Sequence, residues 1–224
     1  MKDKLFSVIG HDMRGPIANI PIVIDIIESE MDVPAEYREM LTLLKEHTNI
    51  TVETLDKLML LGKQYIRGEN FIPEKFNTKP HIRENMELIS FASGKKNITI
   101  EDHTPDDISV YADAAHFDFI IRNLLSNAIK FSFDNSKIEI NADKSRMPGY
   151  IVFSVKDHGT GMSETTLSHI FTASVTSTYG TGSEKGNGIG LMLCKDFIDQ
   201  NGGKIWVESV RSEGSTFYFS LKSA

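Results

Sequence analysis

The stretch FSVIGHDMRGPI (Phe6–Ile17) places one histidine, His11, directly before an acid, Asp12. Because each helical residue turns by about 100°, a helix here would carry His11 nearly opposite the centre of its apolar stripe, toward solvent. An exposed imidazole beside a carboxylate can act as a nucleophile whose proton the carboxylate removes, although many exposed histidines are simply surface. The stripe consists of Ile9, Met13, Ile17, Ile20, Ile24 and Ile27.

A second candidate is DHGTGM (Asp157–Met162), which follows the strand-like run IVFSVK. The aspartate stands at the end of the predicted strand, with glycines two and four positions later. Such glycines let a ligand approach the backbone while the carboxylate accepts a hydrogen bond, for example from the amino group of adenine. Asp-x-Gly also occurs in ordinary turns, so both interpretations remain open here.

A third candidate, GNGIGL (Gly186–Leu191), opens a predicted helix. Glycines at alternate positions would expose backbone N–H groups at the positive end of the helix dipole, where phosphates bind. A plain helix cap would use the same glycines. The spacing differs from the Rossmann fingerprint GxGxxG, and the sequence has no GxxxxGK[ST] loop.

The fourth candidate is RNLLSNAIKF (Arg122–Phe131), in which Asn123, Asn127 and Lys130 share one helix face. Two carboxamides and an ammonium suit oxygen ligation of Mg²⁺ and contact with phosphate. The same residues would also make an unremarkable solvated surface. Each of the four segments is therefore ambiguous on its own.

The composition is that of an ordinary globular protein, with 224 residues, 40% hydrophobic and 25% charged. The net charge of -7 argues against a nucleic-acid partner. Cys194 is the only cysteine, so one chain can form neither a disulfide nor a cysteine metal site, and we expect it to be a small core residue. No apolar run reaches the length of a membrane span and no signal peptide is visible. We expect a cytoplasmic protein without membrane contact of its own, or the cytosolic part of a longer sensor.

The elements that position these residues fall into two parts. We predict a helical hairpin over residues 1–68, whose helices are joined by a turn at Ser29–Tyr37 and bent locally at Pro16 and Pro21. A lone hairpin cannot bury both apolar faces, so a second copy should complete a dimeric four-helix bundle. The second helix carries a coiled-coil-like seam of Leu41, Leu44, Thr48, Thr51, Leu55, Leu58, Gly62 and Tyr65.

Gly, Pro and mixed charge in RGENFIPEKFN (Arg67–Asn77) predict a boundary near residue 70, with a second domain over residues 70–224. Irregularly alternating elements predict an α+β two-layer sandwich. The Gly/Ser/Thr-rich segment Thr172–Gly188 has the texture of a lid or binding loop. The predicted strands are Asn97–Glu101, Lys137–Ala142, Tyr150–Lys156, Lys204–Ser209 and Thr216–Leu221, and the predicted helices are Pro80–Ser93, Ala114–Phe131 and Gly190–Gln200.

Taken in this order, the segments resemble the transmitter region of bacterial two-component sensor histidine kinases over essentially the whole chain. FSVIGHDMRGPI is similar to the family's histidine box, RNLLSNAIKF to its asparagine box, and DHGTGM and GNGIGL to its two glycine boxes. GSTFYFSL (Gly214–Leu221) resembles the closing strand pair of the family's ATP-binding domain.

The resemblance implies an ATP-dependent protein histidine kinase with a phosphoacceptor, His11, on a dimerising hairpin. Its partners would be a second copy of the chain and the receiver domain of a response regulator, to whose aspartate the phosphoryl group passes. Asp12 would fix the tautomer of His11 and take its proton, and Arg14 would offset charge on the transferring group.

The resemblance further implies a Bergerat-type domain that binds ATP and Mg²⁺. Asp157 would accept from adenine, Asn123 and Asn127 would hold Mg²⁺, Lys130 would contact the phosphates, and Phe131 would pack near the base. The other residues expected to bind the nucleotide are Gly159, Gly161, Gly186, Gly188, Gly190, Leu191 and Thr216.

Three positions depart from the family pattern. Gly15 stands where members that dephosphorylate their partner carry Thr or Asn, so we expect weak phosphatase activity. Ser174 replaces the second aromatic of the lid motif that begins at Phe171, and Asn187 replaces a usual Thr.

Two other classes are weighed against this one. A non-catalytic scaffold would bind nucleotide only to regulate a partner, and the set His11, Asp12, Asn127 and Asp157 speaks against it. A chaperone- or topoisomerase-type ATPase needs a glutamate in the asparagine-box helix, where this chain has none.

Overall fold

The computed structural model describes residues 17–31, 33–34, 36–45, 47–48, 51–52, 71–172, 180–181 and 189–224. The chain divides into two compact units, Met1–Asn70 and Phe71–Ala224. Among the helices of these residues, none is long and apolar enough to cross a membrane.

The described part of the first unit is a helical hairpin. Its helical residues are 17–30 on one side and 36–45, 47–48 and 51–52 on the other, so the connection is shorter than the predicted turn at Ser29–Tyr37, whose two ends are helical. The two helices are joined by Lys45, whose ammonium pairs with Asp25 and lies 3.3 Å from Glu28. Arg38 Nε donates to the carbonyl of Val33 at 2.9 Å and so ties the connection to the second helix. The seam residues Leu55, Leu58, Gly62 and Tyr65 lie outside the described residues.

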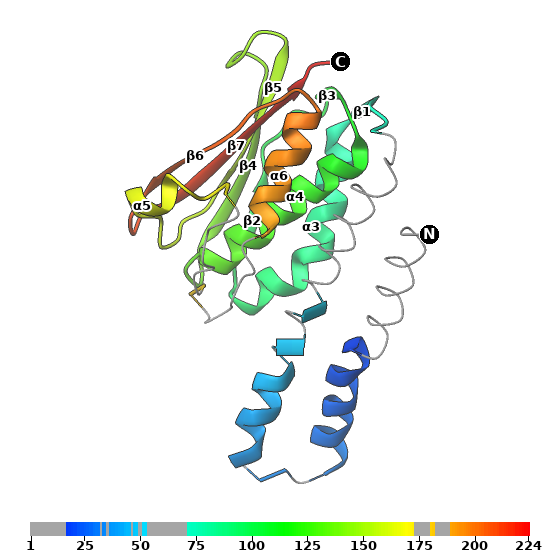
Figure 1. The fold of residues 1–224 in the computed structure, drawn as a ribbon, viewed down its shortest axis with the longest axis vertical. Coiled ribbons are helices and arrows are strands. Elements are labelled where there is room, and N and C mark those ends of the chain that lie inside the picture. Colours follow the sequence, from blue (N-terminus) through cyan, green and yellow to red (C-terminus); the bar gives the residue numbers. More distant parts are fainter. Residues whose placement is uncertain are drawn as a thin grey trace. The chain divides into compact units, whose positions relative to one another are not determined.

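The second unit is a two-layer sandwich, as predicted. A five-stranded sheet has the order β2-β4-β5-β7-β6, in which β2 and β4 are parallel and the other neighbours antiparallel. Figure 1 shows helices α3, α4 and α6 together on one face of this sheet. The sheet strands are β2 (Thr99–Asp102), β4 (Lys137–Asp143), β5 (Tyr150–Lys156), β6 (Ile205–Val210) and β7 (Gly214–Lys222).

The helices of this unit are α3 (Thr78–Lys95), α4 (Ala114–Phe131), the short α5 (Glu164–Leu167) and α6 (Ile189–Gln200). Strands β1 (Glu74–Asn77) and β3 (Ser109–Ala112) form a separate antiparallel pair. The sequence predicted every helix and strand of the sandwich except β1, β3 and α5, each of which has only four residues.

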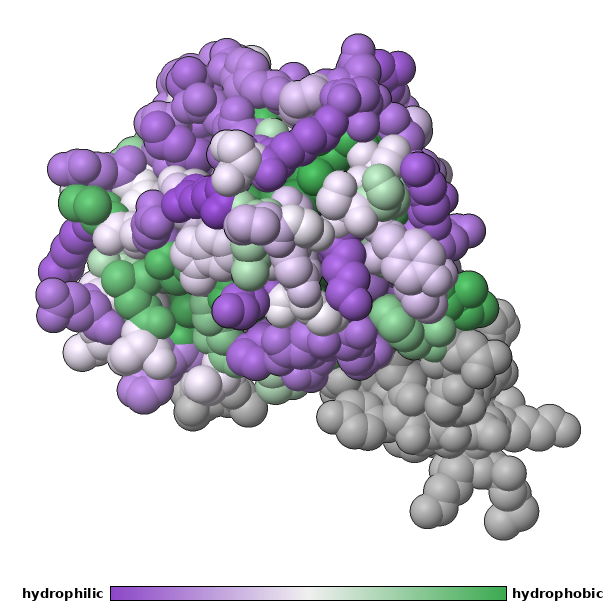
Figure 2. Space-filling model, turned by 90° about the horizontal axis from the view of Figure 1, so that it is seen from above, coloured by the Kyte–Doolittle hydropathy of each residue, from purple (hydrophilic) through white to green (hydrophobic). Residues whose placement is uncertain are grey.

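The core lies between the sheet and its helices. Phe117 of α4 packs edge-on against Phe153 of β5 with ring centroids 5.4 Å apart, and Phe153 stacks on Phe219 of β7 at 4.9 Å. All three rings are fully buried, and such aromatic pairs dominate core energetics. The buried Cys194 of α6 is a core residue, as the sequence predicted. Hydrophilic residues cover much of the face shown in Figure 2, with smaller hydrophobic areas between them.

Candidate functional site

Helix α4 carries three of the predicted site residues. It begins at the N-cap Asp113, whose carboxylate accepts from the N–H of His116 at 3.1 Å. Asn123, Asn127 and Lys130 are partly exposed. The helix positions them because its other face is buried in the core through Leu124, Leu125, Ala128 and Ile129.

The first turn of α6 lies against Asn123. A Cβ on Gly190 would overlap the side-chain oxygen of Asn123, so any larger residue here would displace the Asn123 carboxamide. Gly190 is buried and Leu191 partly buried. The start of α6, where the backbone N–H groups of a first turn lie, is therefore beside a carboxamide of α4. Gly186 and Gly188, predicted to join this site, lie outside the described residues.

Asp157 follows β5 and is almost completely buried, with 4% of its surface exposed. Its backbone N–H donates to Ser215 O at 2.8 Å. The N–H of Ser215 donates in return to Asp157 Oδ1 at 3.1 Å. Burial raises the pKa of this carboxyl to about 6, against the opposing effect of hydrogen bonds from the backbone of Ser215 and Gly159. An ionised carboxylate has about four acceptor positions, so capacity remains for a further donor.

The loop after Asp157 is fastened to the end of α4. The N–H of Thr160 donates to Phe131 O at 3.1 Å, and Ser132 forms a β-bridge with Gly159. A Cβ on Gly159 would overlap the carbonyl of Phe131. These contacts bring the first glycine box next to the end of the asparagine box, which lies 26 positions earlier in the chain (157 − 131).

Gly161 fixes the other side of the same loop. Its φ is +59°, in the left-handed region that favours glycine, and a Cβ would overlap the carbonyl of Val210. The N–H of Ser212 donates to Thr160 O at 2.8 Å. The loop is thus held between α4 and the turn that joins β6 and β7.

Thr216 does not share this environment. It pairs with Lys156 and Glu208 in the sheet, and both neighbours are exposed, so Thr216 belongs to the sheet face opposite the helices. The contact with Asp157 belongs to the preceding residue, Ser215. Neighbouring residues of a strand point to opposite faces, and the nucleotide contact expected of Thr216 stays a prediction.

Lys96 is a further residue of this region, which the sequence did not predict. It lies in the turn after α3, and its ammonium donates to Ile129 O at 3.1 Å and Lys130 O at 2.9 Å. It also contacts Thr181 Oγ1 at 2.8 Å. A cation on the last carbonyls of a helix is favourable, so Lys96 stabilises the end of α4 that carries Lys130 and Phe131. No local motif marks it, because the contact depends on the packing of α3 against α4.

Six of the predicted positions lie outside the described residues, namely His11, Asp12, Arg14, Gly15, Ser174 and Asn187. Phe171, the first aromatic of the lid motif, is described and packs edge-on against Phe217 with ring centroids 6.4 Å apart. Lys130 lies with its ammonium 4.9 Å from the ring centroid of Phe131.

Residues 112–224 match the family of histidine kinase-, DNA gyrase B- and HSP90-like ATPases. The sensor histidine kinase GraS of Staphylococcus epidermidis is 29% identical over 93% of this chain, and the adaptive-response sensory kinase SasA of Synechocystis is 27% identical over 98%. The chain spans 57% and 59% of the lengths of these two relatives.

Solved structures of similar proteins agree with this family match. The catalytic domain of histidine kinase ThkA is 32% identical over 67% of this chain and 95% of its own, with a TM-score of 0.59. Full-length ShkA, solved in complex with AMPPNP, has the same fold over the whole of this chain and 46% of its own, at a TM-score of 0.71 and 21% identity. The chain therefore belongs to the family of histidine kinase-, DNA gyrase B- and HSP90-like ATPases and, within it, to the two-component sensor histidine kinases, whose transmitter region it resembles throughout.

Proposed function

We propose that this chain is the transmitter of a sensor kinase that phosphorylates His11 from ATP and passes the phosphoryl group to an aspartate of a response regulator. Residues 1–68 serve dimerisation and phosphotransfer, and residues 70–224 bind ATP. The observation that carries the proposal is the buried carboxylate of Asp157, fastened by its loop to the end of the helix that bears Asn123, Asn127 and Lys130.

The described residues fit the base of a nucleotide. The carboxylate of Asp157 is shielded from water and retains acceptor capacity, which suits a donor such as the amino group of adenine. The hydroxyl of Ser132 is fully buried and, among the described residues, has no hydrogen-bond partner. Its bridge partner Gly159 belongs to the same loop as Asp157. A buried polar group without a partner is costly, so the Ser132 hydroxyl supports a polar molecule completing this region, as does the remaining acceptor capacity of Asp157.

The described residues also fit the phosphates and Mg²⁺. Asn123 and Asn127 offer carboxamide oxygens from one face of α4, and Lys130 offers an ammonium one turn later. The first turn of α6 adds backbone N–H groups beside Asn123. A bound Mg²⁺ would neutralise phosphate charge. The role of the protein is to hold these donors on two helices that are packed together.

The chemistry proposed for His11 follows from charge. The neutral imidazole presents one nitrogen lone pair to the γ-phosphorus, in line with the leaving oxygen of ADP. The nitrogen–phosphorus bond forms as that phosphorus–oxygen bond breaks, and the proton on the other ring nitrogen passes to Asp12. Arg14 offsets negative charge on the transferring group. The histidine must remain exposed, since it meets first the ATP-binding domain and then the aspartate of the receiver.

Two further parts of the proposal concern assembly and the reverse reaction. The hairpin pairs with that of a second copy to form a four-helix bundle, which would cover its apolar surface. Phosphatase activity toward the regulator is weak, because Gly15 has no side chain with which to position an attacking water.

Incubation of the full chain with γ-labelled ATP and Mg²⁺ tests the proposal. We expect an acid-labile, base-stable label on the wild type and none on His11→Gln, while the two bind nucleotide with equal affinity. A wild type that binds nucleotide but takes up no label is a scaffold and not a kinase. Sustained ATP hydrolysis that is unaffected by His11→Gln would instead identify an ATPase of the chaperone or topoisomerase type.

A further inference from the structure

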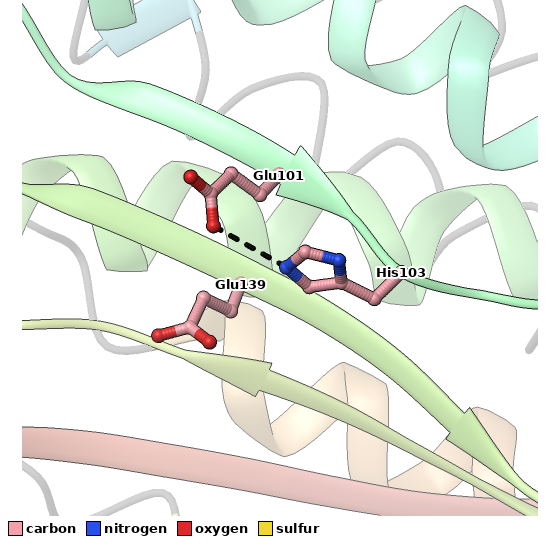
Figure 3. Close-up of side chains that lie close together, drawn as sticks. All are labelled: Glu101, His103 and Glu139. Atoms are coloured by element: carbon pink, nitrogen blue, oxygen red, sulfur yellow. Dashed lines mark hydrogen bonds and ion pairs between the residues drawn. The ribbon is translucent and has the colours of Figure 1, made fainter.

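Two carboxylates and an imidazole meet on the sheet of the second unit, outside the proposed nucleotide site. Glu101 lies in β2, His103 directly follows that strand, and Glu139 lies in β4. One donor atom from each residue lies within 4.8 Å of the other two. Figure 3 shows the three side chains on the sheet face that points away from the helices. They therefore contact solvent and not the core.

The register of the sheet brings these groups together. Glu101 and Glu139 are direct partners in the parallel pair β2·β4, and like charges directly opposite one another destabilise a sheet. His103 follows Glu101 by two positions and so lies on the same face. Its Nε2 is 3.3 Å from Glu101 Oε2. A cation between the two carboxylates would relieve their repulsion.

Lysine supplies that cation in the present structure. Lys137 Nζ lies 3.5 Å from Glu101 Oε2 and 3.3 Å from Glu139 Oε1. Its side chain is 47% exposed, and ion pairs of such exposed lysines contribute little to stability. The ammonium can therefore leave for water at small cost, and its departure opens the space between the two carboxylates.

Glu139 also faces Lys156 Nζ at 3.9 Å and His158 Nε2 at 3.8 Å. Of the cationic side chains around Glu139, Lys137 also contacts Glu101, so its ammonium is the one that a metal ion between the two carboxylates would replace. The position of His158 is fixed from its other nitrogen, since Nδ1 lies 3.1 Å from Lys137 O.

We propose that Glu101, His103 and Glu139 bind a divalent transition metal such as Zn²⁺, which takes the place of the Lys137 ammonium. One imidazole and two carboxylates form a donor set of the kind found in zinc sites with three protein ligands and a water molecule. Mg²⁺ and Ca²⁺ favour sites made of oxygen alone, so the imidazole selects against them. The site stands apart from the proposed kinase chemistry and does not depend on it.

Titration of the metal-free full chain with Zn²⁺ by calorimetry, and with Co²⁺ by visible absorption, tests this assignment. We expect His103→Ala to weaken Zn²⁺ binding by about tenfold or more. His169→Ala is the matched control, since His169 is also exposed but lies beyond α5, and it should bind as the wild type does. Equal Zn²⁺ affinity in the wild type and His103→Ala would overturn the proposal.

Lys137→Met gives a second and opposite test. Because the ammonium and the metal compete for the same two carboxylates, its removal should strengthen Zn²⁺ binding severalfold. Circular dichroism and thermal unfolding establish that the variant is folded before the titration. Zn²⁺ affinity that is unchanged or weaker in folded Lys137→Met would contradict the proposed competition, and the His103→Ala comparison stands if this variant does not fold.

Discussion

The two units of the chain differ in how they treat apolar side chains. In the second unit Phe117, Phe153 and Phe219 are fully buried between the sheet and its helices. In the described part of the first unit, Ile22 is 56% and Ile26 49% exposed on one helix, and Leu43 and Leu44 are about half exposed on the other. The second unit thus contains a complete core, whereas the hairpin leaves apolar surface on both of its helices.

The difference matches the roles proposed for the two units, nucleotide binding for the second unit and dimerisation for the hairpin. A site that must grip a nucleotide gains from a rigid core, because the donors keep their geometry without the ligand. A hairpin with apolar residues around most of its circumference needs further apolar surface to cover it. The proposed dimer supplies that surface. Four predictions can break or sharpen the contrast: two concern substitutions in the loop of the second unit, one a substitution in the hairpin, and one the pH dependence of stability.

The largest expected effect is on the stability of the second unit. Gly161→Ala places a methyl group where the carbonyl of Val210 lies and forces alanine to a φ of +59°. We expect a loss of about 4 kcal/mol in unfolding free energy, since backbone must move to relieve the overlap. Urea unfolding monitored by the fluorescence of Trp206, which lies in β6, measures it.

Gly94→Ala is the control for that substitution. Gly94 lies near the end of α3, and a Cβ there meets nothing within 4 Å. Alanine in a helix is favoured over glycine by about 0.5–1 kcal/mol, so this variant should be slightly more stable. Similar stability of the two alanine variants would show that the loop is not tightly held.

The second prediction concerns nucleotide affinity. Asp157→Asn keeps the shape of the side chain but removes its negative charge and one acceptor, so it should weaken nucleotide binding by about 100-fold, or about 3 kcal/mol. Calorimetry with a non-hydrolysable ATP analogue measures the loss. Asp134→Asn, at an exposed position of the turn after α4, should bind normally. Unchanged affinity in Asp157→Asn would mean that the base lies elsewhere.

The elements that support this site were predictable where local signals are strong. Helix α4 has a capping aspartate, an apolar stripe and 18 residues, and its predicted bounds are confirmed. β1 and β3 were not predictable, because four residues such as EKFN become a strand only through pairing with residues 32 to 38 positions away (109 − 77 and 112 − 74). The connection between the two helices of the hairpin was predicted to be longer than it is for a similar reason. Helix ends depend on contacts such as that of Arg38 with Val33.

The residues of the candidate site likewise include some that a local sequence pattern predicts and some that it does not. Asp157 and its glycines were predicted from the motif alone, because a strand end followed by glycine is a local pattern. Ser215 could have been found, since Phe217, Phe219 and Leu221 alternate inward and place position 215 on the same face. Lys96 could not, because nothing in its own turn predicts that it contacts the last carbonyls of α4.

The third prediction addresses the hairpin. Ile26→Asp places a charge on apolar surface that the proposed dimer covers, so it should weaken self-association by about 2 kcal/mol, the usual worth of burying such a side chain. Sedimentation equilibrium over a range of protein concentrations measures the change. Glu39→Gln, on an already polar exposed position, should leave the dimer intact. If Ile26→Asp associates as strongly as the wild type, this face does not lie in the interface.

The smallest expected effect is a pH dependence of the second unit. Burial raises the pKa of Asp157 from its ordinary value of 3.8 to about 6 in the folded protein, so the folded state binds more protons than the unfolded state between these values. Stability due to this group is therefore fully present below pH 4 and is lost as the pH rises through 6. From pH 5 to pH 7 the unfolding free energy should fall by about 1 kcal/mol more in the wild type than in Asp157→Asn. Urea unfolding of both proteins at several pH values gives that difference, in which other titrating groups cancel.

A nucleotide that donates to the carboxylate favours its charged form, so saturating ligand should move the wild-type transition toward lower pH. Parallel pH profiles of the two proteins would show that Asp157 is better solvated than its burial indicates.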